Sequence, residues 1–317
     1  MIEARNLSKG FGARKVVDNV SFQAEKGETL ILLGTSGSGK TTTLKLLNRI
    51  IEPDSGEVFI DSQPAHSFPA PLLRRGIGYV LQDTGLFPHY TIGENIAVVP
   101  KLLGWTQEKI KSRTLELLGH FGLSESYYTA YPSALSGGQK QRVGFVRALI
   151  ASPPIILMDE PFGALDPVTR QSARNDFKSL PELKDKCIIM VTHDIQEAFQ
   201  LGDRIIIMDE GRIQQMGTRN ELVSNPANAF VRNFLKNQYL FLQLEIRKLK
   251  QFYSGFLIHP PEGILIGEIR DDESLEKAFE TFSPDQSTEV LGVRNDEGEI
   301  RFTTARRLME LLAGDMP

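Results

Sequence analysis

Residues 34–41 match the pattern G-x-x-x-x-G-K-[ST] at every fixed position. Such a loop needs a strand before it and a helix after it, because its glycines let successive backbone N–H groups point at one anion near a helix N-terminus. The flanking residues fit, since 28–33 form a short apolar run and 42–47 are typical of a helix. We therefore predict a strand, loop and helix that bind phosphate. Lys40 would neutralise phosphate charge, and the Thr41 hydroxyl would be available to magnesium.

Composition excludes several other classes of protein. The 317 residues are enough for two domains, and the net charge of -4 argues against nucleic acid as a main partner, because phosphate backbones require a basic face. The single cysteine, Cys187, excludes an internal disulfide framework and a Cys-rich zinc site. No apolar run approaches the roughly 18 residues of a transmembrane helix, and no signal-peptide core is evident. We expect a cytosolic chain that touches a membrane only through a partner.

A second pair of glycines, Gly137 and Gly138, follows Ser136. The apolar positions of the next residues, 140–150, have helical spacing, so Ser136 is predicted to be the N-cap of a helix. Consecutive glycines at a helix start expose backbone donors beside the serine hydroxyl. In principle this is a second anion site.

Two more apolar runs are predicted to be buried strands that end in polar side chains. Residues 154–158 lead into Asp159 and Glu160, and residues 187–191 lead towards His193. Because neighbouring side chains of a strand point in opposite directions, the two carboxylates can take different tasks. We assign Asp159 to magnesium and Glu160 to orienting and deprotonating an attacking water. His193, at the same sheet edge, could bond the terminal phosphate and that water.

Taken together, these segments resemble the ordered motif set of the nucleotide-binding domain of ATP-binding cassette (ABC) transporters, over roughly residues 1–235. The resemblance rests on residues 34–41, 135–139, 159–160, 163–166 and 193. It implies that Gln82 joins magnesium and the attacking water to the transporter contact. It also implies that Phe11 stacks on adenine, although a core aromatic is the alternative for that ring.

The resemblance implies a homodimer in which two copies pack head to tail and close over ATP. Ser136, Gly137 and Gly138 of one copy would contact the γ-phosphate held by the other, and Asp166 would lie near the dimer axis. The implied ATP contacts are Phe11, Gly34, Ser36, Gly37, Ser38, Gly39, Lys40, Thr41, Thr42, Ser136, Gly137, Gly138, Gln139 and Asp166. The implied Mg²⁺ ligands are Thr41, Gln82 and Asp159, and the implied catalytic residues are Glu160, His193 and Gln82.

Residues 82–105 resemble the importer subgroup that energises uptake of quaternary-amine osmoprotectants such as glycine betaine, choline or carnitine. Residues 85–89 and 99–105 carry this resemblance, whereas Asp83 replaces an expected glutamine. It implies integral membrane permease subunits as partners, an extracytoplasmic solute-binding protein indirectly, and a peripheral place at the cytoplasmic face of the membrane. Two alternatives stay open: the ATPase of an importer for amino acids or another small solute, and a soluble ABC protein that acts on nucleic acid or ribosomes.

The motifs end near residue 235 and the composition changes. Residues 237–252 are predicted to form one connecting helix. The strands, hairpin and helices predicted beyond it lie at 263–269, 274–282, 289–294, 300–304 and 305–312. This order resembles a single unit of a CBS domain, a unit that normally occurs in pairs. Two copies in a dimer could pair and sense salt or nucleotide, or they could only dimerise.

The predicted architecture is therefore α/β. Residues 1–235 would form an ABC ATPase domain of the P-loop NTPase fold, with a mainly parallel sheet and a helical subdomain at about 86–151. Residues 236–254 would connect it to a small α+β, CBS-like unit at 255–317.

Overall fold

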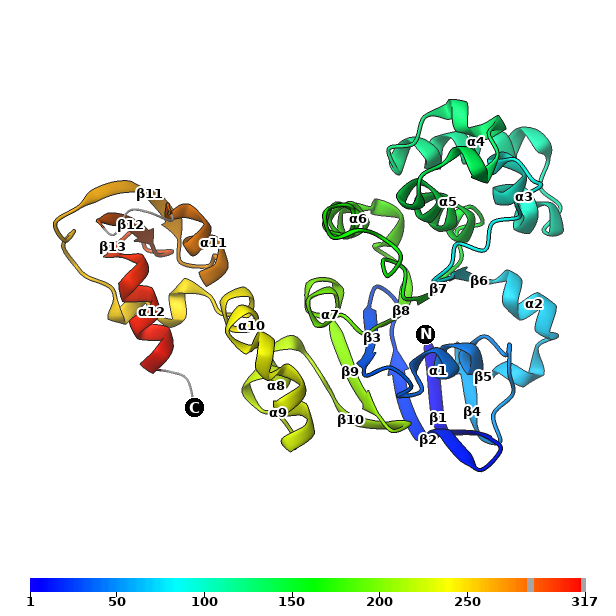
Figure 1. Ribbon diagram of the computed structural model, residues 1–317, viewed down its shortest axis with the longest axis horizontal. Coiled ribbons are helices and arrows are strands. Elements are labelled where there is room, and N and C mark those ends of the chain that lie inside the picture. The colour runs from blue at the N-terminus through cyan, green and yellow to red at the C-terminus, as the bar shows by residue number, and fades with distance from the viewer. Residues whose placement is uncertain (284–287, 315–317) are drawn as a thin grey trace. The chain divides into compact units, whose positions relative to one another are not determined.

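The computed structural model describes residues 1–283 and 288–314, so the last residues of the predicted unit at 255–317 lie outside the described part. The chain divides into two compact units (Figure 1). The first unit comprises residues 1–222 and 226–231, and the C-terminal unit comprises residues 223–225 and 232–317.

A six-stranded sheet forms the centre of the first unit, in the order β10-β9-β3-β8-β7-β6. Its strands are β3 (Thr29–Gly34), β6 (Ile77–Val80), β7 (Ile155–Asp159), β8 (Cys187–Thr192), β9 (Arg204–Asp209) and β10 (Arg212–Gly217). Neighbouring strands are parallel except for the antiparallel pair β9 and β10. The predicted mainly parallel sheet is thus confirmed. Strands β3, β7 and β8 are buried almost throughout, as expected for a parallel sheet covered on both faces.

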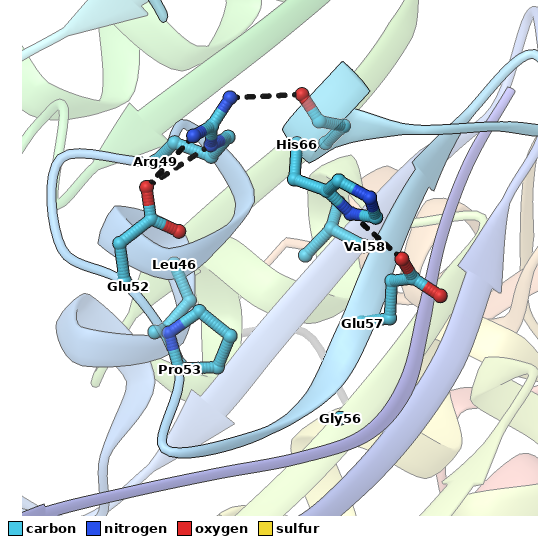
Figure 2. A pocket seen from close by; sticks show the side chains of 9 residues that line it. Leu46, Arg49, Glu52, Pro53, Gly56, Glu57, Val58 and His66 are labelled. Carbon is cyan, nitrogen blue, oxygen red and sulfur yellow. Dashed lines mark hydrogen bonds and ion pairs between the residues drawn. The ribbon is translucent and has the colours of Figure 1, made fainter. Parts of the chain in front are cut away.

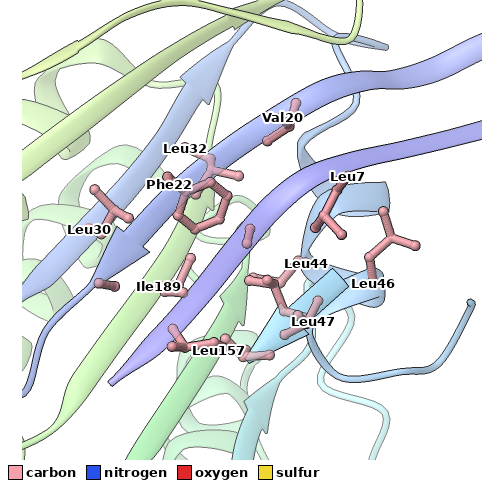
Figure 3. Packing of buried hydrophobic residues seen from close by; sticks show 14 of the residues in the cluster. Leu7, Val20, Phe22, Leu30, Leu32, Leu44, Leu46, Leu47, Leu157 and Ile189 are labelled. Carbon is pink, nitrogen blue, oxygen red and sulfur yellow. The ribbon is translucent and has the colours of Figure 1, made fainter. Parts of the chain in front are cut away.

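A four-stranded antiparallel sheet, which the sequence analysis did not predict, packs against this core. It consists of β1 (Ile2–Phe11), β2 (Arg14–Ala24), β4 (Ser55–Ile60) and β5 (Gln63–Pro64). Figure 3 shows its Leu7 and Val20 in one cluster with Leu32 of β3, Ile189 of β8 and Leu44 of α1 (Lys40–Leu47). This shared core fixes the amino-terminal sheet against the loop at residues 34–41.

Helices α3 (Ile92–Leu102), α4 (Gln107–His120) and α5 (Gly137–Leu149) form most of the predicted helical subdomain. Ser136 caps α5 as predicted, accepting a hydrogen bond from the N–H of Gln139, whose side chain bonds back to the N–H of Ser136. The other α-helices of this unit and its border are α2 (Ala70–Arg75), α6 (Pro167–Ser179), α7 (Ile195–Leu201), α8 (Arg219–Ser224) and α9 (Ala229–Leu235). Short 3-10 helices lie at Ala65–Ser67, Glu125–Thr129, Pro132–Ala134 and Pro181–Leu183.

None of the helices in the described ranges 1–283 and 288–314 has both the length and the apolar character needed to cross a membrane.

The C-terminal unit contains a three-stranded sheet in the order β11-β12-β13. Its elements beyond residue 260 are β11 (Ile264–Arg270), α11 (Leu275–Thr281), β12 (Glu289–Arg294), β13 (Ile300–Thr303) and α12 (Ala305–Gly314), the predicted order of strand, helix, hairpin and helix. Strands β11 and β12 are parallel, and β12 and β13 are antiparallel. Leu275, Leu291, Val293 and Leu308 lie in the core of this unit.

The helix predicted over residues 237–252 is wrong beyond residue 246. After a 3-10 turn at Lys236–Gln238, α10 spans only Tyr239–Ile246, and shorter 3-10 helices follow at Leu249–Gln251 and Tyr253–Gly255. Arg247 is extended, with φ -83° and ψ 139°. The N–H of Leu249 donates to the carbonyl of Glu273 at 3.0 Å. This bond to a distant segment replaces a helical one, and Leu249 is buried in the core of the C-terminal unit.

Candidate functional site

The carboxyl ends of β3, β8 and β7 meet at one edge of the central sheet. In the strand register, Leu33 lies opposite Thr192 and Asp159 lies opposite Val191. The loops that follow these strands therefore start at the same level, where a pocket of about 460 Å³ opens. It is lined by Val16, Ser36, Gly37, Ser38, Gly39, Lys40, Thr41, Thr42, Gln82, Glu160 and His193. Among these lining residues, Val16 alone was not predicted from the sequence, and it lies on β2 of the antiparallel sheet.

The loop between β3 and α1 passes so close to its neighbours that it requires glycine at both ends. At Gly34, an added Cβ would lie 2.1 Å from the carbonyl oxygen of Met208. Gly39 has φ +96°, and a Cβ there would lie 2.3 Å from the carbonyl oxygen of Val16. A side chain at either position would push the loop away from β9 or β2, so the two glycines set where the loop lies.

The ammonium group of Lys40 is buried within this loop. Its Nζ donates hydrogen bonds to the carbonyl oxygens of Gly34 at 2.9 Å and Thr35 at 2.7 Å, and to Ser38 Oγ at 3.3 Å. Burial lowers the pKa of Lys40, while the charges of Glu160 and Asp159 act in the opposite direction. A buried cation bonded to neutral oxygen atoms favours an anion beside it, and this cradle fits a phosphate group.

The adjacent carboxylates at the end of β7 have different partners. Asp159 Oδ1 accepts a hydrogen bond from Thr41 Oγ1 at 2.7 Å, and burial raises the pKa of Asp159 although this bond lowers it. Glu160 Oε2 lies 3.1 Å from His193 Nδ1 and accepts a bond from Gln82 Nε2 at 3.4 Å. The two carboxylates therefore belong to different sets of contacts. Asp159 bonds to Thr41, whereas Glu160 contacts His193 and Gln82.

Other predicted site residues lie elsewhere in the first unit. Phe11 ends β1 and is 54% exposed. Asp166 caps α6 by accepting a hydrogen bond from the N–H of Thr169 at 3.1 Å. Within the described residues, the following predicted contacts are not among those that line the pocket: Phe11, Gly34, Ser136, Gly137, Gly138, Gln139, Asp159 and Asp166.

A polar cluster next to His193 was not predicted from the sequence. It consists of the buried Arg174 on α6, the partly buried Asp194 that caps α7, and the buried Glu197 in the first turn of α7. One local signal was present, because Asp194 and Glu197 have the three-residue spacing of a helix cap. The partner Arg174 is distant in the chain, and a single sequence does not pair it with this cap.

A smaller hollow of about 80 Å³ lies beside α1 and β4 (Figure 2). Its charged side chains bond to one another: Arg49 pairs with Glu52 at 3.0 Å, and His66 Nδ1 lies 2.8 Å from Glu57. Arg49 also donates to the carbonyl oxygens of Ala65 and Phe68, so these charges hold a turn in place.

A glycine-lined loop after a buried parallel strand, with two carboxylates and a histidine at the ends of adjacent strands, defines a P-loop nucleotide-hydrolysing domain. The family model described as ABC transporter matches residues 17–163. The glycine betaine/carnitine/choline transport ATP-binding protein of Bacillus subtilis (strain 168) is 48% identical over 253 residues, which cover 79% of this chain and 67% of that protein. This chain belongs to the ABC transporter family, as its motif set predicted.

Two further comparisons extend this result. The carnitine transport ATP-binding protein of Listeria monocytogenes serotype 1/2a (strain 10403S) is 42% identical over 302 residues, covering 95% of this chain and 73% of that protein. A solved dimeric ATP-binding cassette in a post-hydrolysis state, bound to ADP and Pi, aligns with a TM-score of 0.62 and 35% identity, covering 69% of this chain and 98% of that one. Family membership and this similarity identify the first unit as an ABC-type ATPase.

Proposed function

We propose that this chain is the ATP-hydrolysing subunit of an importer for a quaternary-amine osmoprotectant: glycine betaine, choline or carnitine. The ATPase site is inferred from one observation: Lys40, Glu160 and His193 line the same pocket. The solute class rests on the two relatives, which are named for transport of these solutes, and on the resemblance of residues 82–105. The nucleotide-binding subunit does not choose the solute, so an importer of an amino acid or another small solute is the alternative.

In the proposed reaction, the loop at 34–41 and Thr42 hold the phosphates of ATP, and Lys40 neutralises their charge. The hard oxygens of Thr41, Gln82 and Asp159 fit Mg²⁺, which supplies charge neutralisation on the phosphates when bound. Glu160 orients and deprotonates the attacking water. His193, 3.1 Å from Glu160, contacts the terminal phosphate.

We also propose that a second copy of the chain completes this site. Ser136 and Gly137 are exposed at the start of α5, next to the partly buried Gly138 and Gln139. Backbone N–H groups at this helix start can bind the γ-phosphate held by the loop of the other copy. The dimeric state of the solved cassette supports this arrangement. Phe11 would stack on adenine, and Asp166 would lie near the dimer axis.

The proposed membrane partner is a pair of permease subunits, with a solute-binding protein engaged indirectly. Beside Gln82, the first unit exposes three large side chains: Leu81 is 39%, Phe87 49% and Tyr90 47% exposed. Such a surface suits a short helix from a membrane subunit. The chain would then act as a peripheral subunit at the cytoplasmic face of the membrane.

For the C-terminal unit we propose the role of a single CBS-like unit that pairs with its copy in the dimer. Its surface ion pairs, such as Arg294 with Glu268, would weaken as salt screens them. A purely dimerising role is the competing proposal. Deletion of residues 255–317 in the reconstituted complex decides between them: an unchanged response of ATPase activity to salt would exclude a salt sensor.

Uptake in cells that lack the protein tests the solute class. We expect the full chain, and not its Lys40→Ala variant, to restore uptake of tritiated glycine betaine, choline or carnitine. Restored uptake of an amino acid alone would support the alternative importer. Co-purification tests the partner class, since detergent-extracted membrane subunits support an importer, whereas nucleic acid would support a soluble ABC protein.

A further inference from the structure

We propose that Arg174 is a positioning residue for ATP hydrolysis: it ties α6 to the loop that carries His193, and so holds the imidazole at Glu160. The inference deepens the proposed roles of His193 and Glu160 and is independent of the transported solute.

Arg174 is placed to make this connection because it is almost fully buried between two helices. Its side chain is 3% exposed, and Nη2 donates to Asp194 Oδ2 at 2.5 Å and lies 3.6 Å from Glu197 Oε2. One guanidinium thus faces two carboxylates, one on the N-cap residue of α7 and one within α7. Arg170, one turn earlier on α6, lies farther from Asp194, at 3.9 Å.

The same carboxylates fix both neighbours of His193 in the chain. Thr192 Oγ1 donates to Glu197 Oε2 at 3.1 Å and accepts from the N–H of Asp194 at 3.0 Å. Asp194 Oδ1 accepts from the N–H of Glu197 at 3.1 Å. The His193 side chain itself is 61% exposed. Its position therefore depends mainly on the backbone on either side, which this cluster holds.

The other end of the connection reaches Glu160. The N–H of Gly163 donates to the carbonyl of Glu160 at 3.1 Å, so the chain turns directly after the carboxylate and then enters α6. Arg170 Nη2 donates to the carbonyl of Leu165 at 2.8 Å and holds the end of that turn against α6. Helix α6 thus carries the turn after Glu160, while Arg174 joins α6 to the turn after β8. One helix fixes the relative positions of the two residues.

Electrostatics explains why the connection depends on Arg174. Burial raises the pKa of Glu197 to about 7, against the lowering effect of Arg174. For Asp194, burial acts to raise the pKa, but the N–H of Glu197 and the charge of Arg174 hold it below its usual value. Within the described residues, Glu197 Oε1 has no hydrogen-bond partner. Without Arg174 the cluster would lose its nearest cation, since Arg170 lies 3.9 Å from Asp194, and the loop would shift towards water.

The test compares three variants of the full chain: Arg174→Met, Arg174→Lys and Asp176→Asn. Asp176 is the matched control, because it also lies on α6 and forms an ion pair with an arginine, Arg142, at 2.9 Å. Unlike Arg174, the Asp176 side chain is 51% exposed. We expect Arg174→Met to lower kcat by about tenfold or more while the KM for Mg-ATP changes by less than about twofold, since displacement of a catalytic group slows turnover without removing phosphate contacts. Arg174→Lys keeps the positive charge but loses the planar guanidinium, so its kcat should lie between those of the wild type and Arg174→Met.

A merely structural role would lower the folded fraction and leave the remaining active sites normal. Histidine NMR separates the two cases, because the chain has five histidines and the His193 signal can be assigned with His193→Gln. We expect the His193 resonance to shift in Arg174→Lys and to stay unchanged in Asp176→Asn. Wild-type kcat in Arg174→Lys, or an unmoved His193 resonance, would overturn the proposal, even if Arg174→Met fails to fold. Failure of the assigned role of Glu160 would show separately, as normal hydrolysis by Glu160→Gln.

Discussion

The two units of this chain differ in how exposed their strands and their charged side chains are to water. In the first unit, β3, β7 and β8 are buried almost throughout. In the C-terminal unit, the edge strand β11 exposes Ile264, Leu265, Glu268 and Arg270. The loops at the end of the covered strands can therefore hold charges away from water, whereas the charges on β11 remain solvated.

The pKa values show what this difference means for function. Burial shifts the pKa of Lys40, Asp159 and Glu197 in the first unit. In the C-terminal unit, Glu268 and Arg294 form an ion pair with each other, and their side chains are 41% and 48% exposed. The first unit holds these charges in low dielectric in and around its pocket, whereas the exposed pair of Glu268 and Arg294 in the C-terminal unit is a contact that salt can screen.

The largest expected effect is that of Glu160→Gln. Loss of the proposed base should slow phosphate release by at least about 100-fold, while Mg-ATP binding persists and a closed dimer accumulates. Phosphate release, nucleotide binding and sedimentation measure the three outcomes. Glu268→Gln removes a solvated carboxylate from the other unit and should retain wild-type hydrolysis within about twofold. Equal rates in the two variants would refute the role assigned to Glu160.

Core truncations should separate the two units by stability. Ile189 and Leu291 are both 0% exposed, one in each core, so replacement by alanine should cost about 2–5 kcal/mol in the unit that carries it. The single tryptophan, Trp105, lies in the first unit and reports its unfolding alone. We expect Ile189→Ala to shift the Trp105 transition in urea, and Leu291→Ala to lower hydrogen-exchange protection in β12 and β13 instead. A matching Trp105 shift in Leu291→Ala would mean that the units unfold together.

These differences also explain what the sequence could predict. The loop at 34–41 and the ends of β7 and β8 were predictable, because each is a local pattern and parallel strands bring their ends to one edge. The antiparallel sheet was missed because β1 pairs with β2 and β4 through register shifts that interrupt the regular alternation.

Two further errors have the same cause: long-range contacts that one sequence does not reveal. Arg174 lies 20 positions from Asp194, and each residue alone is an ordinary surface residue type. Residues 247–252 have helical spacing, but Leu249 bonds to Glu273 and packs in a core that forms only when both segments meet. Tertiary contacts override local periodicity there.

A smaller effect is expected from pH, at Glu197 of the first unit. The pKa of Glu197 is about 7 in the folded chain, above the value of about 4.3 for an unfolded one, so the folded state holds its proton more tightly. This contribution to stability is present below about pH 4.3 and is lost as pH rises to about 7. Glu197→Gln cannot titrate and should gain stability relative to wild type across this range. Urea unfolding followed by Trp105 at about pH 5 and pH 8 measures the gain, and a difference that does not change with pH would contradict the assignment.

The smallest effect should come from the exposed ion pair of the C-terminal unit. Glu268 Oε2 lies 2.5 Å from Arg294 Nη2, but both side chains are about half exposed, so water and ions screen their attraction. Glu268→Gln should therefore change the opening free energy of β11 and β12, measured by hydrogen exchange, by less than about 1 kcal/mol. The difference should shrink as salt rises from about 0.05 to 0.5 M, because the Debye length becomes shorter than the spacing of most surface charges. A loss above about 2 kcal/mol that persists in high salt would show that solvent does not screen this pair and would contradict its assignment as an exposed contact.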